Sequence, residues 1–156
     1  MPLSAGSLGA MKRSEALTAL SHQHHQGLFV ALQLKRATAE TAAEACKAFL
    51  DFFRQEGASH FRAEEEVLLP AYARHSDFDQ PAIVRVLTEH VDLRRRGQDL
   101  EASREPDPAD LRELGERLES HIRLEERVLF PMIEQALPAE ELEQLGADVA
   151  RVTGDK

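Results

Sequence analysis

The residues of this chain that could do chemistry gather in two similar segments, residues 60–70 (HFRAEEEVLLP) and residues 121–131 (HIRLEERVLFP). The segments are identical at seven of eleven positions, and each places a His four residues before a Glu. On an α-helix, side chains four residues apart lie one turn apart on the same face. Each segment can therefore direct an imidazole and a carboxylate at one cation, or let its carboxylate bridge two cations. The two pairs are His60–Glu64 and His121–Glu125.

Both pairs interrupt apolar stripes at helical spacing, which predicts that they face the core. The stripe continues with Val67 after the first pair and with Val128 after the second. Two further histidines, His24 and His90, interrupt apolar stripes in the same way. All four long helical patterns of the chain are thus predicted to direct a His inward, and two of them add a Glu.

A single pair of this kind is more often a surface salt bridge, and a single inward His is more often a satisfied core residue. Both pairs together with two more inward histidines favour a cation site. A buried polar group without a partner costs about 1–3 kcal/mol, and a buried carboxylate costs more. A pair of bound cations would remove this penalty by giving every inward nitrogen and oxygen a partner. The neighbouring acids Glu65, Glu66 and Glu126 are interpreted as a solvated face.

The elements that must position these residues are helices, because helix-forming residues dominate and strand signals are negligible. Asp107 followed by Pro108 predicts an N-cap and first turn, and Thr41 with Glu44 predicts a capping box. Short loops between long helices predict an all-α fold, an antiparallel up-down-up-down four-helix bundle with a short C-terminal fifth helix. The helices are expected at residues 14–37, at residues 41–70, from residue 81 to a linker at 105–108, from residue 108, and from residue 138.

Length and composition indicate one globular domain, with 156 residues of which 42% are hydrophobic. We expect a flexible N-terminal tail at residues 1–12, the domain at 13–150 and a C-terminal tail at 151–156. The net charge of −9 argues against a nucleic-acid partner. There is no apolar run long enough to span a membrane and no pattern of a signal peptide, so a cytoplasmic location is expected. The one cysteine, Cys46, is predicted to be a small buried hydrophobe.

The paired HxxxE segments, each ending in a leucine-containing turn and a Pro, resemble the hemerythrin-like (HHE cation-binding) domain family. The resemblance extends from about residue 17 to residue 145. It implies a four-helix bundle that holds a cofactor of two Fe ions, an oxo- or hydroxo-bridged non-haem di-iron centre. Mixed His and carboxylate ligands also bind Zn or Mn, which could substitute for iron. The implied terminal ligands are His24, His60, His90 and His121, and the implied bridging carboxylates are Glu64 and Glu125.

Three positions need separate comment. His25 is an alternative to His24 as the ligand from the first helix, although His24 lies nearer the centre of the apolar stripe. Oxygen-carrying hemerythrins have a fifth His where this chain has Arg94, and their last motif carries an Asp five residues after its His, where this chain has Glu125 at four. The resemblance is therefore closer to iron-sensing and bacterial stand-alone members of the family, and the missing ligand is expected to leave a more open site.

Two classes of function follow from the resemblance. The first is a binding protein, in which a di-iron centre binds or senses dioxygen, reactive oxygen or nitrogen species, or iron itself. The second is an enzyme that decomposes peroxide or reduces nitric oxide at an open di-iron site. In both, the partner is a small molecule such as O2, peroxide or NO. A bundle that uses another divalent metal is a third hypothesis, and the oligomeric state is left open.

Overall fold

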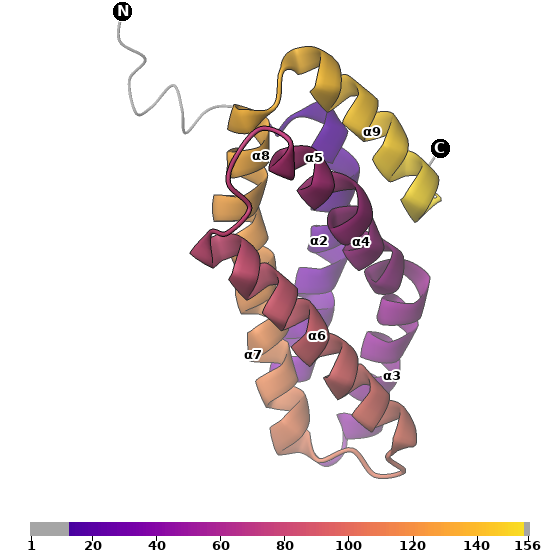
Figure 1. Cartoon of the computed structure of the whole chain (residues 1–156). Helices are drawn as coiled ribbons and strands as arrows, with labels where there is room; N and C mark the ends of the chain where they lie inside the picture. Colours follow the sequence, from indigo (N-terminus) through magenta and orange to yellow (C-terminus); the bar gives the residue numbers. More distant parts are fainter. Residues whose placement is uncertain (1–12, 155–156) are drawn as a thin grey trace, which may run out of the picture.

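The computed structural model describes residues 13–154, and every regular element among them is a helix. Figure 1 shows an elongated bundle in which the longest helices run side by side, with the last helix across one end. The predicted tail at residues 1–12 lies outside the described residues. No helix in the described part of the chain is both long and apolar enough to cross a membrane. The all-α prediction is thus confirmed for these residues.

Within residues 13–154 the structure has five helical rods, two of which contain wider π-type turns. The second rod is continuous from α3 to α5, and the fourth from α7 to α8. The final helix reaches Thr153, three residues beyond the domain boundary expected at residue 150. The elements are α2 (Glu15–Lys35); α3 (Ala42–Phe52), η1 (Phe53–Gly57), α4 (Ala58–Ala63), η2 (Glu64–Leu68) and α5 (Leu69–Ala73); α6 (Pro81–Ala102); α7 (Pro108–Leu124), η3 (Glu125–Leu129) and α8 (Phe130–Ala136); and α9 (Ala139–Thr153).

Helix starts were predicted with mixed success. Asp107 caps α7 as expected, because its Oδ1 accepts the N–H of Ala109 at 2.9 Å. The capping box predicted at Thr41 is wrong, since the Thr41 side chain makes no cap hydrogen bond to α3. Its Oγ1 instead accepts the N–H of Thr38 at 2.9 Å, which closes the turn before the helix. The Thr41 hydroxyl thus accepts from the backbone N–H of Thr38 instead of from a backbone N–H of the helix.

Each repeated segment contains a π-type turn that begins at its glutamate. The N–H of Leu69 bonds to the carbonyl of Glu64, five residues back, and the N–H of Phe130 bonds to that of Glu125. A proline follows both turns, and a proline inside a helix removes one backbone hydrogen bond and crowds the preceding turn. The wider turn relieves that crowding. Such turns occur often at functional sites, and the sequence analysis did not foresee them.

The extra residue in the π-type turn also explains a wrong prediction about the core. Val128 was placed on the inward stripe of the fourth rod, but its side chain is 39% exposed. The additional residue moves the inward face one position later in the sequence than α-helical spacing predicts. Leu129 and Phe130 therefore point inward in place of Val128. Cys46, in contrast, is buried as predicted.

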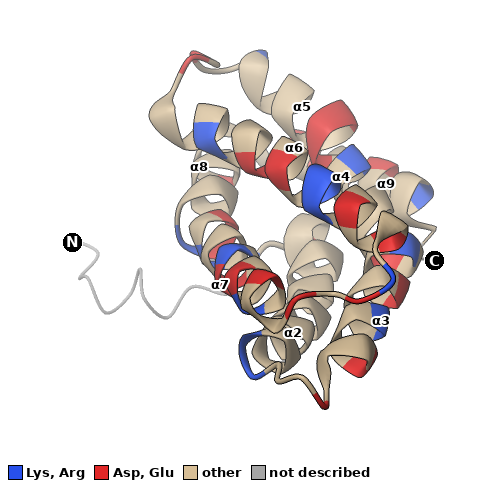
Figure 2. Ribbon diagram, turned by 90° about the horizontal axis from the view of Figure 1, so that it is seen from below, with Lys and Arg blue, Asp and Glu red and all other residues tan. Residues whose placement is uncertain are grey.

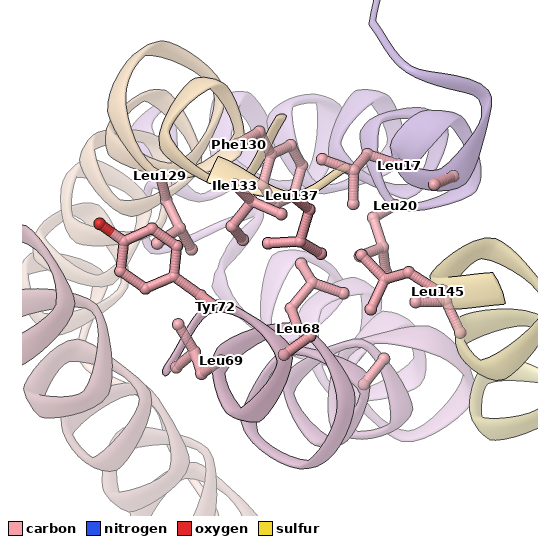
Figure 3. Close-up of a cluster of buried hydrophobic side chains, with 14 of the residues drawn as sticks. Leu17, Leu20, Leu68, Leu69, Tyr72, Leu129, Phe130, Ile133, Leu137 and Leu145 are labelled. Atoms are coloured by element: carbon pink, nitrogen blue, oxygen red, sulfur yellow. The ribbon is translucent and has the colours of Figure 1, made fainter. Parts of the chain in front are cut away.

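Two apolar clusters fill the interior, one on each side of a polar layer. The first cluster, shown in Figure 3, joins α2, α5, α8 and α9, and includes Leu17, Leu68 and Phe130. The second cluster lies toward the other end and includes Leu34 and Phe49. Along every long rod, the residues of the first cluster and those of the second flank the predicted inward histidines. The polar layer is therefore shielded from water at both ends by packed side chains.

The rods α2 and α7 approach each other closely. A Cβ built on Gly115 would lie 2.8 Å from the carbonyl oxygen of Ala31 and 2.8 Å from the backbone N of Lys35. Backbone atoms cannot move aside as a flexible side chain can, so only glycine fits at this crossing.

Seen from one end in Figure 2, acidic and basic residues are interspersed over the helices.

Candidate metal centre

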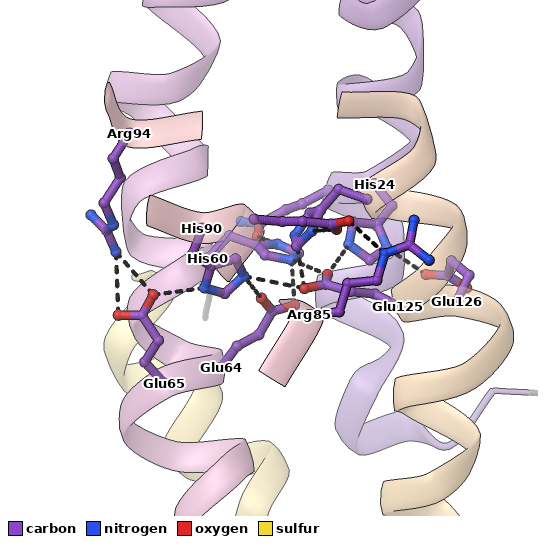
Figure 4. A network of polar contacts seen from close by, with 12 residues as sticks. His24, His60, Glu64, Glu65, Arg85, His90, Arg94, Glu125 and Glu126 are labelled. Carbon is purple, nitrogen blue, oxygen red and sulfur yellow. Dashed lines mark hydrogen bonds and ion pairs between the residues drawn. The ribbon is translucent and has the colours of Figure 1, made fainter. Parts of the chain in front are cut away.

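Six polar side chains meet in the layer between the two apolar clusters. Four rods contribute, so residues far apart in sequence come together (Figure 4). Each of the six is at most 5% exposed, and both carboxylates are fully buried. These residues are His24 on α2, His60 on α4, Glu64 in η2, His90 on α6, His121 on α7 and Glu125 in η3.

The six side chains divide into two groups that share both carboxylates. In what we term the first ligand group, the Nε2 of His24 lies 2.9 Å from Oε1 of Glu125, and the Nε2 of His60 lies 2.9 Å from Oε2 of Glu64. In the second ligand group, the Nε2 of His90 lies 3.0 Å from Oε1 of Glu64, and the Nε2 of His121 lies 3.0 Å from Oε2 of Glu125. Each carboxylate thus presents one oxygen to each group.

The ligand atoms of each group lie within 4.8 Å of one another, close enough to surround one cation. Two buried atoms of the cluster, Oε1 of Glu64 and Nε2 of His121, make no hydrogen bond, although each lies 3.0 Å from an oppositely charged group, His90 and Glu125 respectively. A buried polar atom without a hydrogen bond costs up to about 1–3 kcal/mol, and a cation would bind both atoms. Imidazole nitrogen and carboxylate oxygen suit Fe, Zn and Mn, so the residues present fit divalent metals without selecting one.

The electrostatics of the cluster favour basic imidazoles beside an anionic Glu125. Burial lowers the pKa of His60, but the carboxylates of Glu64 and Glu125 outweigh burial and raise that pKa to about 10. The same opposition raises the pKa of His90 to about 11. Burial acts to raise the pKa of Glu125, but His121 and the other imidazoles hold it well below its usual range. A cation that enters the cluster must therefore displace protons from imidazoles.

Each inward imidazole has a second partner on its outer nitrogen. This hydrogen bond fixes the ring orientation and leaves Nε2 facing the cluster, as is common for histidines that bind metals. Three of the partners are carboxylates and one is an amide. The Nδ1 of His24 donates to Glu126 at 2.6 Å, that of His90 to Glu65 at 2.6 Å, that of His121 to Glu89 at 2.8 Å, and that of His60 to the amide oxygen of Gln23 at 2.9 Å.

These outer contacts correct the interpretation of the acids beside the motifs. Glu65 and Glu126 were assigned to a solvated face, but both are half-buried and accept a hydrogen bond from an inward His. Only Glu66 is exposed, where it pairs with Arg62. The error arose because each acid contacts a His on a different rod, which helical spacing within one rod cannot reveal.

Two more partners, Gln23 and Glu89, were missed by the sequence analysis. Each directly precedes an inward His in the chain, yet each serves the His of a neighbouring rod: Gln23 contacts His60, and Glu89 contacts His121. A polar residue beside a ligand candidate was the one available signal. Its partner could be identified only once the rods were placed side by side.

Arginines hold the outer carboxylates in place. The guanidinium of Arg94 lies 3.3 Å from both oxygens of Glu65 and stands over the ring of Phe61, which in turn stacks on His90 with 3.9 Å between ring centroids. Arg94, at the position of the fifth His in oxygen-carrying hemerythrins, therefore contacts the outer carboxylate. Arg13 donates to one carboxylate oxygen and the backbone carbonyl of Glu126 and stands over Phe130, which stacks on His24. Arg85 donates to Glu89.

The remaining histidines lie apart from the cluster. His25, the alternative ligand on the first helix, is exposed and points away, whereas its neighbour His24 is 4% exposed and belongs to the first ligand group. His22 is exposed as expected. His75 is also exposed, and its ring lies 2.8 Å from Glu141 of α9.

A small cavity of about 20 Å³ adjoins the first ligand group. Aromatic rings, including those of Phe49 and Phe53, make up much of its wall. Its polar lining consists of Gln23, His24, His60, His121 and Glu125. A volume of about 10–15 Å³ suffices for one water, so this cavity can accept a molecule of two or three atoms. A larger organic substrate would not fit there without movement of the rings.

Comparison with known proteins supports what the geometry indicates. The family model described as "Hemerythrin HHE cation binding domain" matches residues 16–133, which include all six residues of the cluster. No match was found among curated proteins or among solved structures. Because the family model covers well over half of the 156 residues, this chain belongs to the hemerythrin HHE cation-binding domain family.

Proposed function

We propose that this protein holds two iron ions in a non-haem di-iron centre. The observation that carries the proposal is that both buried carboxylates lie between the two ligand groups, with one oxygen toward each. The proposal assumes an antiparallel up-down-up-down bundle of the four long rods, with α9 as the fifth helix. The terminal nitrogen ligands would be His24, His60, His90 and His121, and the bridging carboxylates would be Glu64 and Glu125.

The function that we infer is to bind or sense dioxygen, reactive oxygen or nitrogen species, or iron. Iron, when bound, supplies redox chemistry and affinity for small ligands of this kind. The chain contributes a fixed ligand set, because outer hydrogen bonds orient each imidazole. Its apolar clusters exclude bulk water, and the cavity of about 20 Å³ beside His24 and His60 limits the ligand to a few atoms.

Elemental analysis of purified protein, combined with its optical spectrum, tests this proposal. We expect two metal atoms per chain and near-ultraviolet and visible bands that respond to azide or oxygen. The Glu125→Ala variant, which removes a ligand from both groups, should lose metal and bands. Glu66→Ala, which changes an exposed acid in the same kind of motif, is the matched control and should keep both. A colourless protein that stays spectrally silent after anaerobic iron loading would contradict the proposal.

A second candidate function is an enzyme that decomposes peroxide or reduces nitric oxide. The position of Arg94 favours it, because this side chain contacts Glu65 and leaves the second ligand group with two imidazoles, His90 and His121. Fewer protein ligands leave more room for a substrate at the centre. Turnover well above that of free iron would support an enzyme. Rates no higher than those of a Glu64→Ala variant would argue against it.

The choice of metal needs its own test, since the donor set also suits Zn and Mn. We expect protein purified from cells grown with all three metals to contain mainly iron. Protein that contains zinc or manganese instead would support a bundle that uses another divalent metal.

A further inference from the structure

The two ligand groups differ in the outer partners of their imidazoles. In the second ligand group, both His90 and His121 donate to carboxylates, those of Glu65 and Glu89. In the first ligand group, His24 also donates to a carboxylate, at 2.6 Å. His60 differs from the other three, because its Nδ1 donates to the neutral amide oxygen of Gln23 at 2.9 Å.

Neighbouring arginines reinforce the difference between the charged and the neutral outer partners. Each outer carboxylate has an arginine within 3.3 Å: Arg13 at Glu126, Arg94 at Glu65 and Arg85 at Glu89. These guanidiniums stabilise the carboxylates as anions, so each remains a hydrogen-bond acceptor for its imidazole. The amide of Gln23 carries no charge and has no such support among the contacts found.

The type of outer partner changes how well an imidazole binds a cation. An anionic acceptor on Nδ1–H makes the opposite nitrogen more basic, and mutation of an outer partner typically lowers metal affinity about 10–100-fold. A hydrogen bond to a neutral acceptor is about half as strong as one to an anion. The His60 imidazole is therefore the weakest donor of the four, and it lies in the first ligand group.

We propose that Gln23 makes the two cation positions unequal, so that the first ligand group fills last and empties first. This inference rests on the proposed function, because it requires both groups to hold a cation. Gln23 is a positioning residue that acts through His60. One consequence is a window of free cation concentration, about 10–100-fold wide, in which only the second ligand group is filled. Within that window occupancy reports the cation level, which favours an iron-responsive role for this centre.

Stepwise cation binding to the metal-free protein tests the inference. Co2+ is a suitable probe, because its visible bands report each bound ion, and a competing chelator sets its free concentration. We expect two binding steps in the unaltered protein. Gln23→Glu should strengthen the weaker step about 10–100-fold and bring the two together. Gln26→Glu makes the same change of charge at an exposed position of α2 and should leave both steps in place.

A second variant makes the opposite exchange, from carboxylate to amide, and distinguishes an effect of the outer partner from a general structural effect. Glu89→Gln removes a carboxylate from His121 and should weaken the stronger step by a similar factor, while the weaker step stays where it was. If Gln23→Glu fails to fold, the Glu89→Gln result decides the question alone. Equal Co2+ affinities of the two steps in the unaltered protein would overturn the inference and leave the proposed function intact. A variant that shifts the affinities of both steps by the same factor would do the same. Absence of any cation binding would overturn both.

Discussion

Removal of the bound cations should lower the melting temperature of this protein by a predictable amount. Most polar atoms of the cluster keep partners when no cation is present, because the imidazoles and carboxylates also contact one another. Two buried atoms make no hydrogen bond, Oε1 of Glu64 and Nε2 of His121, although each lies 3.0 Å from an oppositely charged group. The free energy that these two atoms gain from a cation gives an order-of-magnitude measure of the stability that bound cations add.

Each orphaned atom costs about 1–3 kcal/mol, so the two together amount to about 2–6 kcal/mol. For a domain of this size, 1 kcal/mol changes the melting temperature by about 2–4 °C. The expected difference between cation-loaded and chelated protein is therefore roughly 4–24 °C. Stabilisation of about 4 kcal/mol corresponds to a free cation concentration about 1,000 times the Kd.

Thermal unfolding followed by circular dichroism or calorimetry measures this difference. The chelated protein would be compared with samples reloaded with Zn2+ in air or Fe2+ without oxygen, and elemental analysis would confirm each metal content. The melting temperature should rise with the logarithm of free cation. Glu64→Ala should show a much smaller rise, since this variant disrupts both ligand groups. A change below about 2 °C after confirmed metal loss would show that cations do not stabilise the fold to this extent.

Three further predictions concern the ligand from α2, the packing of the rods and the effect of pH. His24→Ala should reduce metal content from two atoms toward one per chain, whereas His25→Ala should leave it unchanged; equal losses in elemental analysis would contradict the assignment of the first ligand group. Gly115→Ala should lower the free energy of unfolding by about 1–2 kcal/mol, because overpacking exceeds the gain in helix propensity. Gly97→Ala, whose Cβ would meet only a ring atom at 3.6 Å, should raise the free energy of unfolding by about 0.5–1 kcal/mol. Urea titration of both glycine variants would show whether their unfolding free energies change in opposite directions. In the metal-free protein, burial lowers the pKa of His90, but the carboxylate partners outweigh burial and raise this pKa to about 11. The stability that protonated His90 contributes is therefore complete below about pH 6.5 and is lost as the pH rises toward 11. Chelated protein that becomes more stable over that range in urea titrations would contradict the sign.

Much of this protein could be predicted from local patterns in its sequence. The periodicity of apolar residues identified the helices, because the side chains that face a core recur every three to four positions. The same periodicity directed His60 and Glu64 inward, since residues four apart share a face. A π-type turn limits such reasoning, as at Val128, where one additional residue shifts the register after Glu125.

Only the tertiary structure decided which residues meet across the rods. Glu126 follows Glu125 in the chain, yet it contacts His24 of α2, and Gln23 of α2 contacts His60 of α4. Such contacts depend on which rods are neighbours and how each is rotated about its axis. That rotation is set by packing over the whole length of the bundle, including the close approach of α2 to α7 at Gly115. A sequence determines the face of a helix on which a residue lies, but the partner of that face is determined by the packing of all helices together.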